Sequence, residues 1–117
     1  MEGNLYCGFA PEGIDRKIRR LILDLNRAGY TTGSSCQGKG SVREFEAQAG
    51  HARYAFITFD DNLYRFRYQA AMLGLQVYNG NLSICPWCPN EQPETIIARN
   101  LTFEAKVREL FRVEDSK

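Results

Sequence analysis

The sequence contains no long hydrophobic run. None approaches the ~20 consecutive apolar residues that a bilayer span needs, so we expect no transmembrane helix. The amino terminus, Met1–Asn4, also lacks the basic start and apolar stretch of a secretory signal peptide. We therefore expect a cytoplasmic protein.

An excess of charge of one sign is also missing. Fifteen Lys and Arg against fourteen Asp and Glu give a net charge of +1, so no global field draws the chain to nucleic acid or to an anionic membrane. Any basic site must be local. The composition, 44% hydrophobic and 25% charged, is that of a globular protein, and 117 residues suffice for one core but not for two. We expect a single α+β domain over residues 1–117.

Histidine is scarce. His51 is the one histidine, and four cysteines without a secretion signal indicate thiols or metal ligands rather than a disulfide framework. Neither paired carboxylates nor a complete hydrolytic triad can be named. A non-enzymatic binding domain is therefore favoured, and a small enzyme that uses Cys36 and His51 stays an alternative.

Apolar spacing predicts a first helix over Gly13–Ala28. Its apolar residues recur every three to four positions and share one face, and Gly29 supplies a C-terminal stop. Three arginines, Arg16, Arg20 and Arg27, fall on the opposite face, which we interpret as solvated helix surface.

The clearest strand is Arg53–Phe59, which is rich in β-branched and aromatic residues and should be central. Asp60 and Asp61 are candidate caps of a second helix that ends at Gly74. The remaining predicted elements are strands at Asn4–Phe9, Tyr30–Thr32, Gln76–Tyr78, Leu82–Ile84 and Thr95–Ile97, a loop at Gly33–Gly40, a hairpin turn at Asn79–Gly80, and a last helix at Phe103–Phe111 capped by Asn100 or Thr102. The polar stretch Ser41–Gly50 fits either a strand extension or a surface loop.

In chain order these elements read β-α-β-β-α-β with a C-terminal strand and helix extension. The simplest arrangement places two helices on one face of a four-stranded antiparallel sheet, which is the ferredoxin-like fold. We expect its core over residues 4–86 and the extension over residues 87–117.

The predicted central strand carries the first chemical signal. Alternation sends Tyr54 and Phe56 to the face opposite the helices. With Ala55, Ile57 and Phe59 they match the signature octamer of the RNA recognition motif family, which this strand resembles. The segment Leu5–Cys7 is similar to the start of that family's second signature, on the neighbouring strand.

That resemblance implies a single-stranded RNA or DNA site in which Tyr6, Tyr54 and Phe56 stack on unpaired bases. Arg53 stands where the family has glycine, and it is a candidate phosphate contact. The alternative is that Tyr54 and Phe56 pack under the C-terminal extension.

The loop Gly33–Gly40 carries a second signal. Gly29, Tyr30, Thr32, Ser35, Cys36 and Gly38 form a pattern that is similar to one in small uncharacterised bacterial and phage proteins. Small residues with amides and hydroxyls can cradle an anion, so the candidate ligand residues are Ser34, Ser35, Cys36 and Lys39. This predicts an accessory protein that binds a small phosphorylated ligand or a protein partner. A solvated turn with a buried thiol is the alternative.

A Cys-x-x-Cys pair, Cys85 and Cys88, follows the predicted strand Leu82–Ile84. Two thiolates at this spacing can bind zinc, but a closed structural site needs two more ligands, for which Cys7, Cys36 and His51 are the candidates. Either a structural zinc or reduced cysteines without a cofactor fit this pattern.

Overall fold

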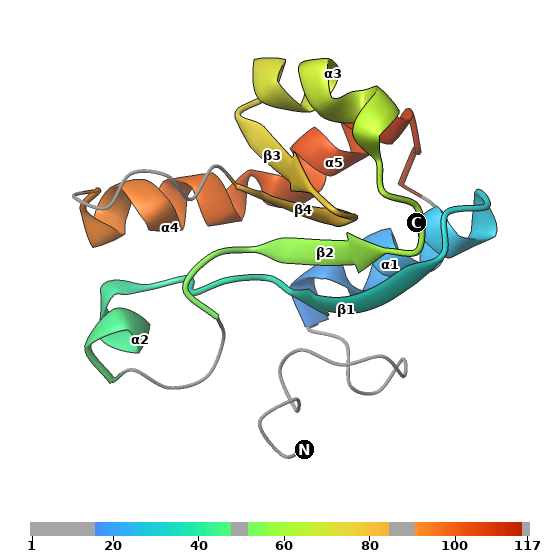
Figure 1. The fold of residues 1–117 in the computed structure, drawn as a ribbon. Coiled ribbons are helices and arrows are strands. Elements are labelled where there is room, and N and C mark those ends of the chain that lie inside the picture. Colours follow the sequence, from blue (N-terminus) through green and yellow to red (C-terminus); the bar gives the residue numbers. More distant parts are fainter. Residues whose placement is uncertain (1–15, 48–51, 85–90, 116–117) are drawn as a thin grey trace.

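The computed structural model describes residues 16–47, 52–84 and 91–115, which contain both strands and helices. The strands are β1 (Thr32–Cys36), β2 (Phe56–Phe59), β3 (Leu75–Tyr78) and β4 (Asn81–Ile84). The helices are α1 (Arg19–Arg27), α2 (Val42–Ala47), α3 (Arg67–Met72), α4 (Pro93–Leu101) and α5 (Phe103–Phe111), with the short 3-10 turns η3 (Arg16–Ile18) and η4 (Tyr64–Phe66) ahead of α1 and α3 (Figure 1).

Within the described residues the strands form one four-stranded antiparallel sheet in the order β1-β2-β4-β3. The fold is thus α+β and compatible with a ferredoxin-like arrangement, and β2 is central as predicted. The strand predicted for Asn4–Phe9 lies outside the described residues. The place beside β2 that the ferredoxin-like order gives to that strand is taken by β4.

The alternation predicted for β2 is confirmed by burial. Ala55 and Ile57 are fully buried and Phe59 is nearly so, whereas Phe56 and Thr58 are only partly buried. The buried face of the sheet joins α1, α3, α4 and α5 in one cluster that includes Leu21, Leu25, Ala70, Ile96, Phe103 and Val107. The C-terminal helices therefore belong to the same core as the sheet. We call the opposite side of the sheet, which carries Phe56 and Thr58, the outer face.

The hairpin predicted at Asn79–Gly80 is confirmed. Both residues have positive φ, 49° and 84°, as a type I′ turn requires. The turn is also tied to the rest of the fold, because the Phe59 amide donates to the Gly80 carbonyl (2.8 Å) and the Gly80 amide donates to the Asn62 carbonyl (3.1 Å). A Cβ at position 80 would lie 2.8 Å from the Phe59 carbonyl oxygen, so only glycine fits.

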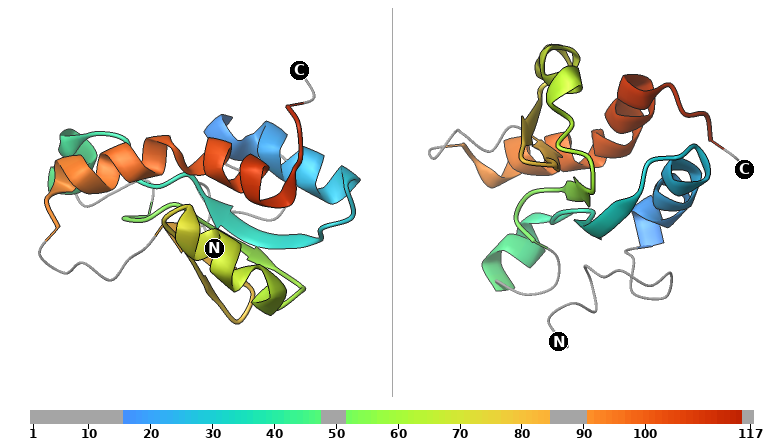
Figure 2. Two further views of the ribbon diagram at one scale, coloured as in Figure 1. Left: turned by 90° about the horizontal axis from the view of Figure 1, so that it is seen from above. Right: turned by 45° about the vertical axis from the view of Figure 1, so that its right-hand side comes forward.

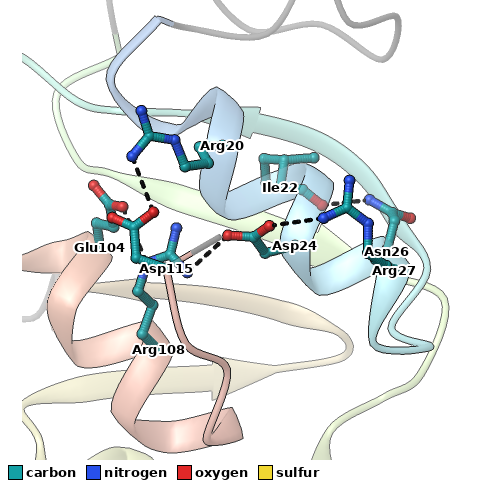
Figure 3. Close-up of polar contacts among 8 residues, drawn as sticks. All are labelled: Arg20, Ile22, Asp24, Asn26, Arg27, Glu104, Arg108 and Asp115. Atoms are coloured by element: carbon teal, nitrogen blue, oxygen red, sulfur yellow. Dashed lines mark hydrogen bonds and ion pairs between the residues drawn. The ribbon is translucent and has the colours of Figure 1, made fainter. Parts of the chain in front are cut away.

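Ion pairs join α1 to the C-terminal part of the chain (Figure 3). The buried Asp24 carboxylate accepts a hydrogen bond from Arg108 of α5 (3.0 Å). Arg20 donates to Asp115 (2.9 Å), and this hydrogen bond raises the pKa of the Arg20 guanidinium. The left view of Figure 2 shows α1 and α5 along the same side of β1. The arginines of the predicted solvated face, Arg16, Arg20 and Arg27, are exposed as predicted. The burial of Asp24 was not predicted.

Two predicted elements are wrong. Thr95–Ile97 is not a strand but the centre of α4, where Pro93 at the first helical position and Glu94 in the first turn favour a helix. Much of the predicted loop Gly33–Gly40 belongs to β1, because its backbone pairs with β2. The undecided stretch Ser41–Gly50 contains α2.

None of the helices in the part of the chain that the structure describes has the length and apolar character that a membrane span requires.

The facing of α1 can be tested by two matched substitutions. Leu21 is 0% exposed and Leu23 is 42% exposed on the same helix. Leu21→Ala should lower the free energy of unfolding by about 2 to 5 kcal/mol because it leaves a cavity, and Leu23→Ala should change it by less than about 0.5 kcal/mol. Urea denaturation measures both. Equal losses would contradict this facing.

Candidate functional site

A buried side chain of α4 organises the region around the start of β2. Asn100 is 6% exposed, and its Nδ2 donates to the carbonyls of Lys39 (2.9 Å) and Arg53 (3.0 Å). Its Oδ1 accepts the amide of Ala55 (2.9 Å). Asn100 therefore holds the backbone on both sides of Tyr54 and ties it to the loop that follows β1.

Gly38 makes this arrangement possible. Its φ is +80°, and a Cβ there would lie 2.5 Å from Asn100 Cγ and 2.7 Å from the Ala55 amide nitrogen. No side chain fits between the loop and Asn100, so glycine is required by both the conformation and the space.

Tyr54, Phe56 and Arg53, three of the candidate nucleic-acid residues, lie at the start of β2 and line one groove. Tyr54 and Phe56 are partly buried, and Arg53 is exposed. The Arg53 guanidinium lies 5.7 Å from the centre of the Tyr54 ring and 4.9 Å from that of Phe45. Part of Tyr54 also packs against the core cluster. The fourth candidate, Tyr6, lies outside the described residues.

An open groove of about 230 Å³ runs over this region. Its lining comes from the segment that enters β2 and from β4, and consists of Ala52, Arg53, Tyr54, Phe56, Asn81 and Ser83. Two aromatic rings, one guanidinium and two short polar side chains thus share one space. The outer face is covered at β1 beside this groove, because Cys36, whose Cα pairs with that of Phe56, is 0% exposed. Such a groove can bind a flat, partly anionic ligand.

The predicted ligand residues of the Gly33–Gly40 segment do not share one space. The Ser34 amide donates to Thr58 Oγ1 (2.8 Å), and Ser35 is 1% exposed, with its Cα paired to that of the inward-facing Ile57. Cys36 Sγ accepts the amide of Ala52 (3.1 Å). Ser34, Ser35 and Cys36 thus make contacts within the sheet or next to it.

Lys39, the fourth predicted ligand residue, lines a separate cavity of about 140 Å³. The other residues that line it come from η3, from the loop after β1 and from the junction of α4 and α5: Lys17, Ile18, Gln37, Gly38, Gly40, Asn100, Leu101 and Glu104. The Gly40 amide is already bound to Glu44 Oε1 (3.1 Å), and Glu104 brings a carboxylate to the same space. The cavity is therefore mixed in charge.

The metal hypothesis falls mostly outside the described residues. Of its candidate ligands, Cys7, Cys85, Cys88 and His51 are not described, and Cys36 is buried. No group of three or more metal-ligating side chains occurs within residues 16–47, 52–84 and 91–115. Zinc bound by Cys85 and Cys88 stays a prediction, as does a Cys36 and His51 pair.

Sequence reasoning missed an aromatic and arginine cluster at the start of α3. The Arg67 guanidinium lies 3.7 Å from the centre of the Tyr64 ring and 4.5 Å from that of Tyr68. The turn before it is fixed by Asp61, whose Oδ1 accepts the Leu63 amide (2.7 Å). That amide, and secondly Arg65, hold the pKa of Asp61 below its ordinary value. The signal was the run Tyr64–Tyr68, in which tyrosine and arginine alternate around Phe66.

Comparison of the chain with protein-family models, with curated proteins and with solved structures finds no match.

The role of Asn100 can be tested by truncation. Asn100→Ala leaves three backbone groups without their hydrogen-bond partner. Each buried group left unsatisfied costs about 1 to 3 kcal/mol, so the free energy of unfolding should fall by about 3 kcal/mol or more. Asn81→Ala, at an exposed asparagine of β4, is the control and should cost less than about 0.5 kcal/mol. Thermal and urea unfolding measure both. If Asn100→Ala is as stable as the control, Asn100 does not organise this region.

Proposed function

We propose that the protein is a non-enzymatic domain that binds single-stranded RNA or DNA through the groove at the start of β2. The observation that carries the proposal is that Tyr54, Phe56 and Arg53 line one open groove together with Asn81 and Ser83. The resemblance to the RNA recognition motif adds Tyr6 to the proposed contacts.

The chemistry of the groove fits unpaired bases. Every base offers a π face, and stacking on an aromatic side chain contributes about 1 to 3 kcal/mol per base whatever the sequence. Asn81 and Ser83 offer short polar groups to base edges or to sugars, and Arg53 is exposed and offers donors to phosphate. A duplex would hide its base faces from such a site.

The partial burial of Tyr54 supports this proposal. Asn100 forms hydrogen bonds with the Arg53 carbonyl and the Ala55 amide. The Tyr54 ring packs partly against the core cluster, and the Arg53 guanidinium lies near it. A ring that is already ordered loses little conformational entropy when a base stacks on it. Because the net charge is only +1, we expect a weak salt dependence that reflects about two or three phosphate contacts.

A small phosphorylated ligand is the second candidate. The cavity of about 140 Å³ favours it, because Lys17 and Lys39 both line that cavity. Glu104 in the same lining opposes it, since a carboxylate repels phosphate. Saturable binding of inorganic phosphate that is lost in Lys39→Gln would favour this candidate. If the same segment instead binds a protein partner, no saturable binding of inorganic phosphate is expected.

Replacing both groove aromatics tests the first proposal. Tyr54→Leu with Phe56→Leu keeps apolar packing but removes the rings, so binding to an unstructured oligonucleotide should weaken by about 2 to 6 kcal/mol. The control is Arg16→Gln with Arg27→Gln, at two exposed arginines of η3 and α1, and it should hardly change affinity. Fluorescence anisotropy measures binding, and the melting temperature verifies that each variant folds.

Two results would contradict the proposal. One is the lack of saturable binding to single-stranded RNA and DNA pools at tens of micromolar protein. The other is a loss of affinity in the arginine variant while the groove variant binds normally.

A further inference from the structure

Three tyrosine side chains of the described residues are largely exposed. They are Tyr64 at 62%, Tyr68 at 69% and Tyr78 at 70% exposed. Tyr64 and Tyr68 lie on η4 and α3, and Tyr78 ends β3. Isolated exposed apolar side chains are normal on a protein surface, but two exposed rings that share one arginine indicate an interaction site.

An arginine lies between two of these rings. Arg67 contacts the faces of both Tyr64 and Tyr68, and its Nη1 donates to the Tyr64 carbonyl (2.8 Å). Within the described residues Arg67 forms no ion pair, so its charge is not neutralised there by a carboxylate. We call Tyr64, Arg67 and Tyr68 the tyrosine clamp. It offers aromatic surface and an unneutralised guanidinium in one place.

The tyrosine clamp has a fixed backbone. The Asn62 side chain accepts the Tyr64 amide (2.8 Å), and Leu63, which is 0% exposed, anchors the turn in the core. A ligand would therefore meet rings whose backbone is already ordered, so binding has little backbone entropy to overcome.

The clamp and the groove at β2 meet at the hairpin. Asn81 lines the groove and is the Cα partner of Tyr78 in the β3–β4 ladder. The Gly80 amide donates to the Asn62 carbonyl, and Tyr78 and Tyr64 each lie two residues from that hydrogen bond. The hairpin end, with the exposed Tyr78, therefore connects the groove to the clamp, and Figure 1 shows the β3–β4 turn beside the segment that leads from β2 toward α3.

We propose that a single nucleic-acid strand bound in the groove continues past Tyr78 to the tyrosine clamp, where bases stack on Tyr64 and Tyr68 and a phosphate binds Arg67. This proposal rests on the proposed function, which gives the class of ligand. An unneutralised guanidinium among aromatic rings fits a strand that alternates flat bases with phosphates.

Two lengths of oligonucleotide separate the two sites. A fluorescein-labelled oligothymidylate of about four nucleotides can fill only the groove, and one of about fifteen nucleotides can reach both. Tyr64→Ala with Tyr68→Ala should weaken binding of the long probe about tenfold to a hundredfold and leave the short probe unchanged. Arg67→Gln should lower the salt slope for the long probe by about 0.7.

The matched control is Leu23→Ala with Val42→Ala, which removes two exposed apolar side chains away from the clamp, at 42% and 38% exposure. It should bind both probes as the unchanged protein does. Because all four substituted positions are exposed, melting temperatures should agree among these variants.

The outcomes of the two proposals are distinguishable. Normal binding of the long probe by the clamp variant overturns the continuation and leaves the groove proposal standing. If instead the groove variant binds both probes normally and the clamp variant fails with both, the groove proposal falls, and so does a path that begins there. Failure of both probes with unchanged protein overturns both proposals.

Discussion

The side chain of Asn100 joins three segments that are far apart in the sequence. It belongs to α4, yet its carboxamide completes the hydrogen bonds of the loop after β1 and of the segment that enters β2. Each of those backbone groups would otherwise be costly to bury. Gly38 leaves the space that this contact needs. The orientation of Tyr54, and with it the shape of the groove, follows from the contact because both neighbours of Tyr54 are held.

The two faces of the sheet carry different kinds of side chain. Core packing takes one face of the sheet, and ion pairs such as Asp24 with Arg108 hold α1 against α5. The outer face keeps aromatic and polar side chains around the groove, and Tyr64, Tyr68 and Tyr78 are exposed before the hairpin turn. With nearly balanced charge overall, recognition would depend on these local groups and not on a long-range field.

Elements with strong local signals could be predicted from the sequence. The Asn79–Gly80 turn, the alternation of β2 and the bounds of α5 at Phe103–Phe111 each follow from residues close together in the chain. Thr95–Ile97 has a high β propensity, but its local context and the burial of Ile96 and Asn100 against the core make it a helix. Tertiary contacts, together with this local context, determine the helical conformation of Thr95–Ile97.

The candidate site was only partly predictable for the same reason. The period-two pattern predicted Tyr54 and Phe56 on the same face, and both line the groove, but it did not predict that Arg53 would line the groove with them. The hydrogen bonds of Asn100 join residues up to 61 positions apart, so no local sequence pattern predicts them. The tyrosine clamp was not predicted because the helical pattern identifies the buried residues of this segment, whereas Tyr64 and Tyr68 are exposed.

Binding of single-stranded nucleic acid in the groove around Tyr54 can be tested by an NMR titration. It follows the backbone amides of the labelled protein while an unstructured oligonucleotide is added. Binding in the groove should cause saturable shifts of the amides of Arg53–Phe56, Asn81 and Ser83, while those of Leu21–Leu25 on α1 stay in place. Shifts confined to Lys17 and Gln37–Gly40, or no shifts at all, would contradict it.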